Sequence, residues 1–489
     1  MIGKNDIRKN TLKEYFLWIF MIVTGVFFFF FAGERGYIIY PDSGSYIEAR
    51  YEREPLYPLI IMMFRSIFGE KLYLYGVVML QSVVALAACI ALTQYIRKNF
   101  GLNRIEAGIT FILLLFPYGL DTMWAEPREN YTHIIMSDAL SYSMFYFFVI
   151  ALIDYLKRKN WSSFWWMVIL TALMTLNRSQ MELCYVIIPI AVIFCFCHME
   201  SGKLRIGWRK IFGRVGILIG AAALTILLTY CYSFFMWGEF ARSSENDFTM
   251  LTNLLYASDA EDEELFSDPD TAMAFRELYG RVDDAGLTYH YAPEGFLENG
   301  KYMLSCHDPM KSGIVRVFFK EYIEEQGLTE SFHSDQIKKE LASELKDVLL
   351  KEHFWRWIYN GLCMVPRGGM YSVTPILPPN MDKAAYFYTA VILIVCIALF
   401  VVHVLQTKRM PEVLTEEKKR RKCLEQWVSC MAIFMVLNVV AVCIIILIIY
   451  RYVNYTQGLF FIMLYLVAKD VIKGRKLLKT KESESRQAE

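Results

Sequence analysis

Residues 14–32 read EYFLWIFMIVTGVFFFFFA, and this apolar stretch decides the fold class. A helix that crosses a bilayer needs about 20 mostly apolar residues, so the stretch can span without help from its neighbours. It is too long for the apolar core of a signal peptide and lacks a small-residue cleavage site. We therefore interpret it as a retained membrane anchor.

Further apolar runs follow along the chain, which is 55% hydrophobic and 16% aromatic. We expect nine more spans, at residues 72–96, 109–120, 134–156, 164–176, 183–197, 215–237, 384–404, 427–450 and 453–468. The sequence thus predicts an all-α polytopic membrane protein with about ten transmembrane helices. Most of the 11 cysteines lie inside apolar runs, where a thiol behaves as a small hydrophobic group. Cys306 and Cys363 both lie in the polar insert, so the sequence allows a disulfide between them, but their spacing does not indicate one.

Lysine and arginine cluster in segments that alternate with the expected spans. Since short cytoplasmic loops carry the excess of these residues, both termini are expected on the cytoplasmic side of a plasma membrane. The basic segments are residues 4–13, 97–104, 157–159, 203–214, 408–422 and 469–481. The segments expected on the outer side are residues 33–71, 121–133, 177–182, 238–383 and 451–455.

This topology predicts three parts of the chain. Residues 1–237 form an N-terminal membrane module, residues 238–383 a mostly helical extracytoplasmic insert, and residues 384–489 the last membrane helices with a basic tail. The insert contains an acidic run at residues 258–284 without the regular spacing of a calcium loop. Near its end, two glycines beside Arg367 predict a loop that contacts substrate.

The first outer segment is unusually polar for a connection between spans. Residues 40–58 read YPDSGSYIEARYEREPLYP and combine carboxylates, arginines and tyrosines. We expect two short helices lying in the membrane interface here, the first after Ser43 and the second after Pro58. Such a place suits chemistry on a lipid-linked substrate.

Other polar groups are expected at the same outer level. Asp138 lies near the start of an apolar span, where a carboxylate is costly; it is either a functional residue or a helix cap. Arg178 and Arg451 supply guanidinium groups, whose forked geometry suits phosphate. His307 in the insert is the most site-like histidine, although a structural role is the more common one for a single histidine.

Several classes of protein are disfavoured by what the sequence lacks. It contains no glycine motif for nucleotide phosphates, no HExxH, no paired CxxC and no basic stripe that would bind nucleic acid. Internal repeats of the kind found in secondary transporters are not evident.

In this arrangement the chain resembles the GT-C superfamily of integral membrane glycosyltransferases. The branch it is most similar to is the bacterial protein-mannosyltransferase-like and aminoarabinose-transferase-like one. The matching features are Asp42 after the first span, Arg53-Glu-Pro-Leu-Tyr-Pro58, Ser137-Asp138, Leu176-Asn-Arg178 and Arg451-Tyr452. The resemblance runs through most of the membrane part and does not include residues 238–383.

The resemblance implies transfer of a sugar from a polyprenyl-phosphate carrier to an acceptor in the cell envelope, at the outer face of the membrane. Asp42 would be the general base, and Asp138 with Glu126 the second acidic element. Arg178 and Arg451 would hold the carrier phosphate. Substrate contacts are further expected from Arg53, Tyr57, Arg367 and Tyr452, and a divalent metal ion, if used, from Asp138, Glu126 or His307. The family usually has a proline after the arginine at 178, whereas Ser179 stands here, so the local turn is in question.

Two other classes remain open at this point. A transporter or flippase for lipid-linked saccharides would carry charged residues near the middle of the bilayer, whereas the polar residues above are expected near its outer surface. A scaffold without catalysis would use the insert to bind a partner. Neither the sugar nor the acceptor can be read from the sequence.

Overall fold

The structure is a computed structural model that describes residues 4–31, 36–50, 52–119, 130–200, 203–238, 240, 245–329, 331–373, 382–410 and 414–488. Helices dominate these residues, as the apolar runs predict. The elements of the first half are α1 (Lys4–Val26), η1 (Phe27–Phe31), α2 (Ser43–Ile47), α3 (Leu56–Phe100), α4 (Arg104–Leu115), η2 (Phe116–Tyr118), α5 (Asp138–Arg158), α6 (Trp161–Asn177), η4 (Ser179–Glu182), α7 (Leu183–Phe196), β1 (Cys197–Glu200), β2 (Lys203–Ile206) and α8 (Trp208–Trp237).

The second half begins with a group of shorter helices and returns to long ones. Its elements are α9 (Glu245–Ala257), η5 (Ala260–Leu265), α10 (Pro269–Asp284), η6 (Tyr289–Tyr291), α11 (Phe296–Asp308), η7 (Pro309–Val315), α12 (Arg316–Glu325), α13 (Phe332–Val373), α14 (Asp382–Arg409), α15 (Thr415–Ala441), η10 (Val442–Ile446), η11 (Tyr450–Tyr452), η12 (Asn454–Thr456) and α16 (Gln457–Ala488).

The chain is a multi-pass membrane protein. Within the described residues, eight helices are long and apolar enough to cross a membrane: Leu12–Phe31, Leu56–Phe100, Asp138–Arg158, Ser179–Phe196, Trp208–Trp237, Lys383–Arg409, Thr415–Ile446 and Asn454–Thr480. Two further predicted spans correspond to α4, with 12 residues, and α6, with 17, which are shorter than a full span. Large apolar side chains such as Phe16, Phe235 and Ile394 are exposed on the outside of the bundle, as expected where lipid is the solvent.

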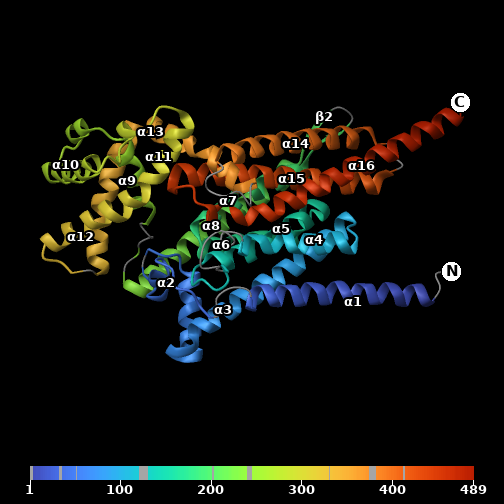
Figure 1. The fold of residues 1–489 in the computed structure, drawn as a ribbon, viewed down its shortest axis with the longest axis horizontal. Helices are drawn as coiled ribbons and strands as arrows, with labels where there is room; N and C mark the ends of the chain where they lie inside the picture. The colour runs from blue at the N-terminus through green and yellow to red at the C-terminus, as the bar shows by residue number, and fades with distance from the viewer. Residues whose placement is uncertain are drawn as a thin grey trace.

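The long helices run side by side, and the shorter ones gather at one end of them. Helices α9 to α13 lie at one end of the molecule, whereas α1 begins and α16 ends at the opposite end (Figure 1). The beginning of the chain and its last helix therefore share one side, and the insert lies on the other. The side that faces the cytoplasm stays a prediction from the lysine and arginine distribution.

The first loop contains the two expected short helical segments. The five-residue helix α2 follows Asp42, and α3 begins at Leu56. Helix α3 breaks at Gly69, which has a φ of +69° that only glycine adopts without strain, so its first part is separated from the long part that spans. Figure 1 shows this first part bending away from the bundle.

Three local expectations change. A small antiparallel hairpin, β1–β2, joins α7 to α8 where only a loop was expected. The predicted loop beside Arg367 is wrong, because α13 continues as a helix through both glycines to Val373; Gly368 lies close to Val439 and Ile448, so it provides space for packing. Cys306 and Cys363 are both free and buried.

The insert and the membrane bundle are packed by apolar contacts that meet at the end of α15. One set of buried side chains fills the bundle. A second joins α9, α10, α11 and α13 of the insert to Val442, Cys443 and Leu447. The segment that carries Arg451 thus lies between bundle and insert.

Close approach of α16 to α4 depends on a glycine. A Cβ atom at Gly458 would overlap the main-chain carbonyl of Leu113 in α4, and main chain cannot rotate out of the way as a side chain can.

We therefore expect Gly458→Ala to lower the free energy of unfolding by about 1–3 kcal/mol, the usual cost of overpacking. Thermal unfolding of the purified protein in detergent measures this. The matched control is Gly220→Ala in α8, where no atom lies within 4 Å of the new Cβ and alanine favours the helix. Equal melting temperatures for the two variants would contradict the close contact.

Candidate functional site

Main-chain hydrogen bonds tie the Asp42 loop to the segment that leads into α5. The amide of Ile38 donates to the carbonyl of His133 at 2.8 Å, and the amide of Ile135 donates to the carbonyl of Ile38 at 3.0 Å. Asp42 and Asp138 follow these paired residues by a few positions each. The two carboxylates are therefore brought to the same end of the bundle by backbone pairing.

Asp42 is held by two arginines from distant parts of the chain. Its Oδ1 accepts from Arg53 Nη2 at 3.1 Å, and its Oδ2 accepts from Arg451 Nη2 at 2.9 Å. Arg53 also donates to Ser45 Oγ at 2.6 Å, and that hydroxyl in turn donates to the carbonyl of Asp42. Burial opposes ionisation of Asp42, but the two guanidinium groups outweigh it and lower the pKa of the carboxyl group from 3.8 to about 2.

Asp138 forms a second ion pair, with Arg178, that is almost closed to solvent. Only 4% of the Asp138 side chain and 12% of the Arg178 side chain are exposed. The guanidinium group of Arg178 also lies over the ring of Tyr452, 4.9 Å from its centre. Asn177 donates from Nδ2 to the carbonyl of Ser137 at 2.8 Å, which fixes the end of α6 against the start of α5. The turn after Arg178 thus forms with Ser179 in place of proline.

The segment that carries Arg451 is held by three side chains that sequence reasoning missed. Tyr142 donates to the carbonyl of Arg451 at 2.5 Å, and Gln180 and Asn438 donate to the carbonyl of Tyr452 at 2.7 and 2.9 Å. These side chains come from α5, η4 and α15. The sequence shows that these three residues are polar and lie in or beside apolar spans. It does not show that all three bind the main chain at Arg451 and Tyr452.

A cavity of about 490 Å³ lies between the bundle and the insert. Of the predicted site residues, it brings together Asp42, Arg53, Asp138, Arg178, His307, Arg451 and Tyr452. Glu52, Glu54, Ser179 and Gln180 complete much of the membrane side.

Two predicted site residues do not line this cavity, and a third cannot be placed. Tyr57 is fully buried, and its hydroxyl donates to Gln81 Oε1 at 2.6 Å. Arg367 lies on α13 and donates from Nε to the hydroxyl of Tyr371 at 3.0 Å. Glu126 lies outside the described residues.

The insert contributes one wall of the cavity. His307, Asp308, Lys311, Ser312 and Arg316 line it from the end of α11, from η7 and from the start of α12. His307 Nδ1 lies 3.1 Å from Asn253 Oδ1, and Lys311 donates to Thr249 Oγ1 at 2.7 Å. Except for His307, these residues were missed; their spacing of four to five residues along a helix was the only signal.

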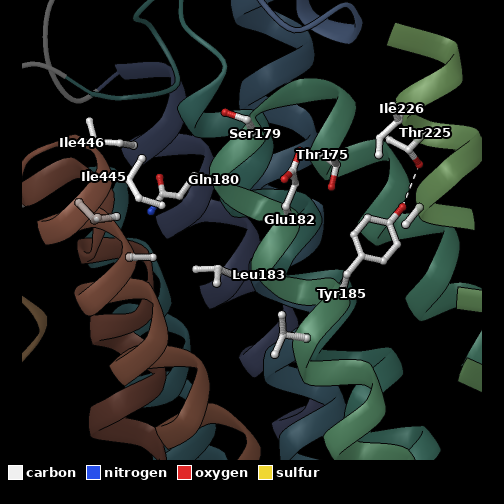
Figure 2. Close-up of a pocket in the computed structure, with 14 residues that line it drawn as sticks. Thr175, Ser179, Gln180, Glu182, Leu183, Tyr185, Thr225, Ile226, Ile445 and Ile446 are labelled. Carbon is white, nitrogen blue, oxygen red and sulfur yellow. Dashed lines mark hydrogen bonds between the residues drawn. The ribbon is translucent and has the colours of Figure 1, made fainter. Parts of the chain in front are cut away.

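An apolar groove of about 520 Å³ adjoins the polar cavity. Ser179, Gln180 and Ile446 line both. The groove continues between α7, α8 and the end of α15 along Leu183, Val186, Ile226 and Ile445 (Figure 2). Tyr185 and Thr225 form a hydrogen bond at its far side, 2.8 Å between the hydroxyl oxygens (Figure 2).

The expected metal ligands do not form a cluster among the described residues. Asp138 is paired with Arg178, and His307 hydrogen-bonds to Asn253. Within the described part of the chain, a group with the residue types and spacing of a metal site is instead found in the insert, at Asp259, Asp262 and His353.

No family model and no curated protein matches the sequence. The comparison with solved structures finds the crystal structure of ArnT from Cupriavidus metallidurans bound to undecaprenyl phosphate. The match covers 87% of this chain and 77% of that one, at 11% identity and a TM-score of 0.30. A score this low carries no correspondence between individual residues.

The pairing of Asp42 predicts a pH-dependent contribution to stability. Because its pKa is lower in the folded chain, the ion pairs stabilise the fold above about pH 4, and this contribution is lost as the pH falls from about 4 to about 2. Asp42→Asn should therefore lower the melting temperature at pH 7 and lower it progressively less below pH 4. Thermal unfolding in an acid-tolerant detergent checks this. A difference that is independent of pH would contradict the pairing.

Proposed function

We propose that this protein is a membrane glycosyltransferase that moves a sugar from a polyprenyl-phosphate-linked donor to an acceptor at the outer face of the cytoplasmic membrane. One observation carries the proposal: Asp42, Asp138, Arg178 and Arg451 come from four separate segments and line the same cavity. Two carboxylates and two guanidinium groups at the ends of membrane helices are the groups that such a reaction needs.

The arginines are suited to the phosphate of the carrier. Arg451 uses Nη2 for Asp42, and its Nε is buried without a hydrogen-bond partner among the described residues. A buried donor of this kind is costly unless a ligand satisfies it. A phosphate oxygen in the cavity would supply a further acceptor for Arg451, and Arg178, whose guanidinium group lies over the same Tyr452 ring, would supply the second guanidinium group.

Asp42 is suited to act as the base once the donor is bound. A carboxylate with a pKa of about 2 accepts protons poorly, since general bases work best with a pKa nearer the working pH. The phosphate of the donor is a diester with one negative charge, and it would compete for Arg451 and offset its charge. The pKa of Asp42 would then rise, which couples donor binding to activation of the acceptor hydroxyl.

The apolar groove gives the lipid tail of the donor a place beside the phosphate site. Its shared residues, Ser179, Gln180 and Ile446, lie where the head of a lipid would pass from the groove into the cavity. A lipid tail gains from burial on such a surface in proportion to its apolar area.

The insert wall faces the same cavity and is proposed to bind the acceptor. It offers Lys311 and Arg316 beside Asp308 and His307, which suits a polar or anionic envelope molecule. In this proposal, residues 1–237 and 384–489 hold the donor, and the insert at residues 238–383 selects the acceptor. Loss of transfer on removal of divalent cations would support an ion at Asp138 or His307.

We expect Asp42→Asn to abolish transfer of the sugar from polyprenyl-phosphate donors, because the neutral amide cannot take the proton from the acceptor. The measurement is release of free undecaprenyl phosphate in membranes given a panel of undecaprenyl-phosphate sugars and an envelope extract. Glu48→Gln is the matched control, since Glu48 is 57% exposed, pairs with Arg50 and does not line the cavity. The activities of the variant, the control and the wild type are compared at equal amounts of protein in the membrane.

Two results would overturn parts of this proposal. Normal turnover by Asp42→Asn would remove Asp42 as the base. If the wild type moves labelled lipid across vesicle membranes and turns over none of the donors, the protein is a transporter instead.

Arg451→Lys should weaken binding of undecaprenyl phosphate about tenfold or more, since an ammonium group cannot replace a forked guanidinium. Native mass spectrometry with the purified protein measures this without knowledge of the sugar. Arg50→Lys is the control, because Arg50 is 56% exposed, pairs with Glu48 and does not line the cavity. Unchanged affinity in Arg451→Lys would exclude Arg451 from the phosphate site.

A further inference from the structure

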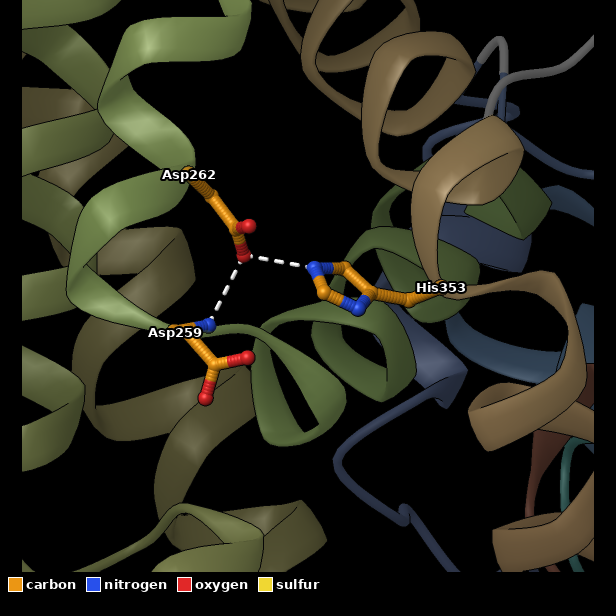
Figure 3. Close-up of side chains that lie close together, drawn as sticks. All are labelled: Asp259, Asp262 and His353. Carbon is orange, nitrogen blue, oxygen red and sulfur yellow. Dashed lines mark hydrogen bonds and ion pairs between the residues drawn. The ribbon is translucent and has the colours of Figure 1, made fainter.

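Two aspartates and a histidine meet inside the insert, away from the cavity. Asp259 and Asp262 lie at the start of η5, directly after α9, and His353 lies on α13 (Figure 3). Helix α13 departs from helical geometry at His353, with φ −100° and ψ 18°. The side chains of Asp262 and His353 point toward each other, and the main-chain nitrogen of Asp259 lies beside the same Asp262 oxygen (Figure 3).

The distances among these groups are short. His353 Nε2 lies 2.6 Å from Asp262 Oδ2, and the same oxygen accepts from the amide of Asp259 at 2.8 Å. One ligand atom from each of the three residues lies within 4.8 Å of the others. The side chains of His353 and Asp262 are 7% and 9% exposed, so the group is largely shielded from water.

Asp259 is also held by groups outside the cluster. Asp259 Oδ1 accepts from the hydroxyl of Tyr289 at 2.6 Å and lies 2.9 Å from His290 Nε2, and its Oδ2 accepts from Arg356 at 2.8 Å. Among the described residues, Arg356 is the one arginine that pairs with either carboxylate. Buried carboxylates are stable when they are paired or bind a metal ion, and here two of them lie together with an imidazole.

We propose that Asp259, Asp262 and His353 bind a divalent metal ion of the zinc class. Carboxylate oxygens and an imidazole nitrogen are zinc ligands at about 2.0–2.2 Å, so ligand atoms on a common ion lie about 3.4 Å apart. The cluster reaches this arrangement if the His353–Asp262 pair opens and Asp259 turns one oxygen inward. Calcium is disfavoured because it takes six to eight oxygen ligands.

The ion takes the place of the proton between His353 and Asp262. An imidazole that binds zinc through Nε2 carries its proton on Nδ1, so His353 takes that tautomer in the bound state. His290 or a water molecule can supply the fourth ligand. The bound ion joins the turn after α9 to the bend of α13, so its consequence is stability of the insert. The site is independent of the sugar transfer proposed above.

The test measures zinc in the full-length protein purified in detergent. We expect the wild type to retain a single zinc ion per chain after dialysis with zinc and gel filtration, and to melt at a higher temperature than the chelator-treated protein. Asp262→Asn and His353→Gln should each lower zinc affinity by more than about a hundredfold, beyond the loss typical of an outer-shell partner. Asp284→Asn and His333→Gln are the matched controls, since both residues are exposed in the insert.

Each outcome decides the proposal. Zinc retained by the controls and lost from both cluster variants supports it. Wild-type protein that retains no zinc, or cluster variants that bind zinc as tightly as the wild type, overturns it. If a cluster variant does not elute as a monodisperse peak, the zinc content and the zinc-dependent melting shift of the wild type decide alone.

Discussion

The ion pair between Asp42 and Arg451 joins the two ends of the membrane part. The residues are 409 positions apart, and their side chains meet at 2.9 Å. Each is costly to bury alone, and together they fix where the first loop sits against the segment before the last span. Arg53 and the Arg178–Asp138 pair extend this contact into a network of alternating charge, and the cavity is the space that the network surrounds.

The ion pairs of this network form without a ligand, and an anionic ligand can still compete for their guanidinium groups. Asp42 and Asp138 each have an arginine partner, so an anion that binds here must compete for a guanidinium group that is already engaged. Tyr142, Gln180 and Asn438 hold the main chain at Arg451 and Tyr452 while this exchange takes place.

The sequence predicted the membrane architecture well because apolar length is a property of each segment alone. It also identified part of the membrane side of the cavity, since Asp42, Asp138, Arg178 and Arg451 are polar groups at the ends of apolar runs. It did not predict the insert wall at Lys311 and Arg316, because whether a helical face meets the bundle depends on packing at α15. Arg367 was misjudged for a related reason: glycines beside it are read as a flexible loop, whereas Gly368 provides space against Val439 and Ile448. Tyr57 looked like a substrate contact and is a buried partner of Gln81.

The groove beside the cavity has a rim of apolar side chains that remain exposed, among them Val186, Ile226 and Ile445. In a bilayer these side chains face acyl chains, so the entrance opens sideways and not into water. A molecule that enters by this route searches a plane, already held at the right depth and with its head toward the charged end of the helices. The rate at which this molecule meets the protein then depends on its density in the leaflet and on the fluidity of the membrane. That rate does not depend on a concentration in solution.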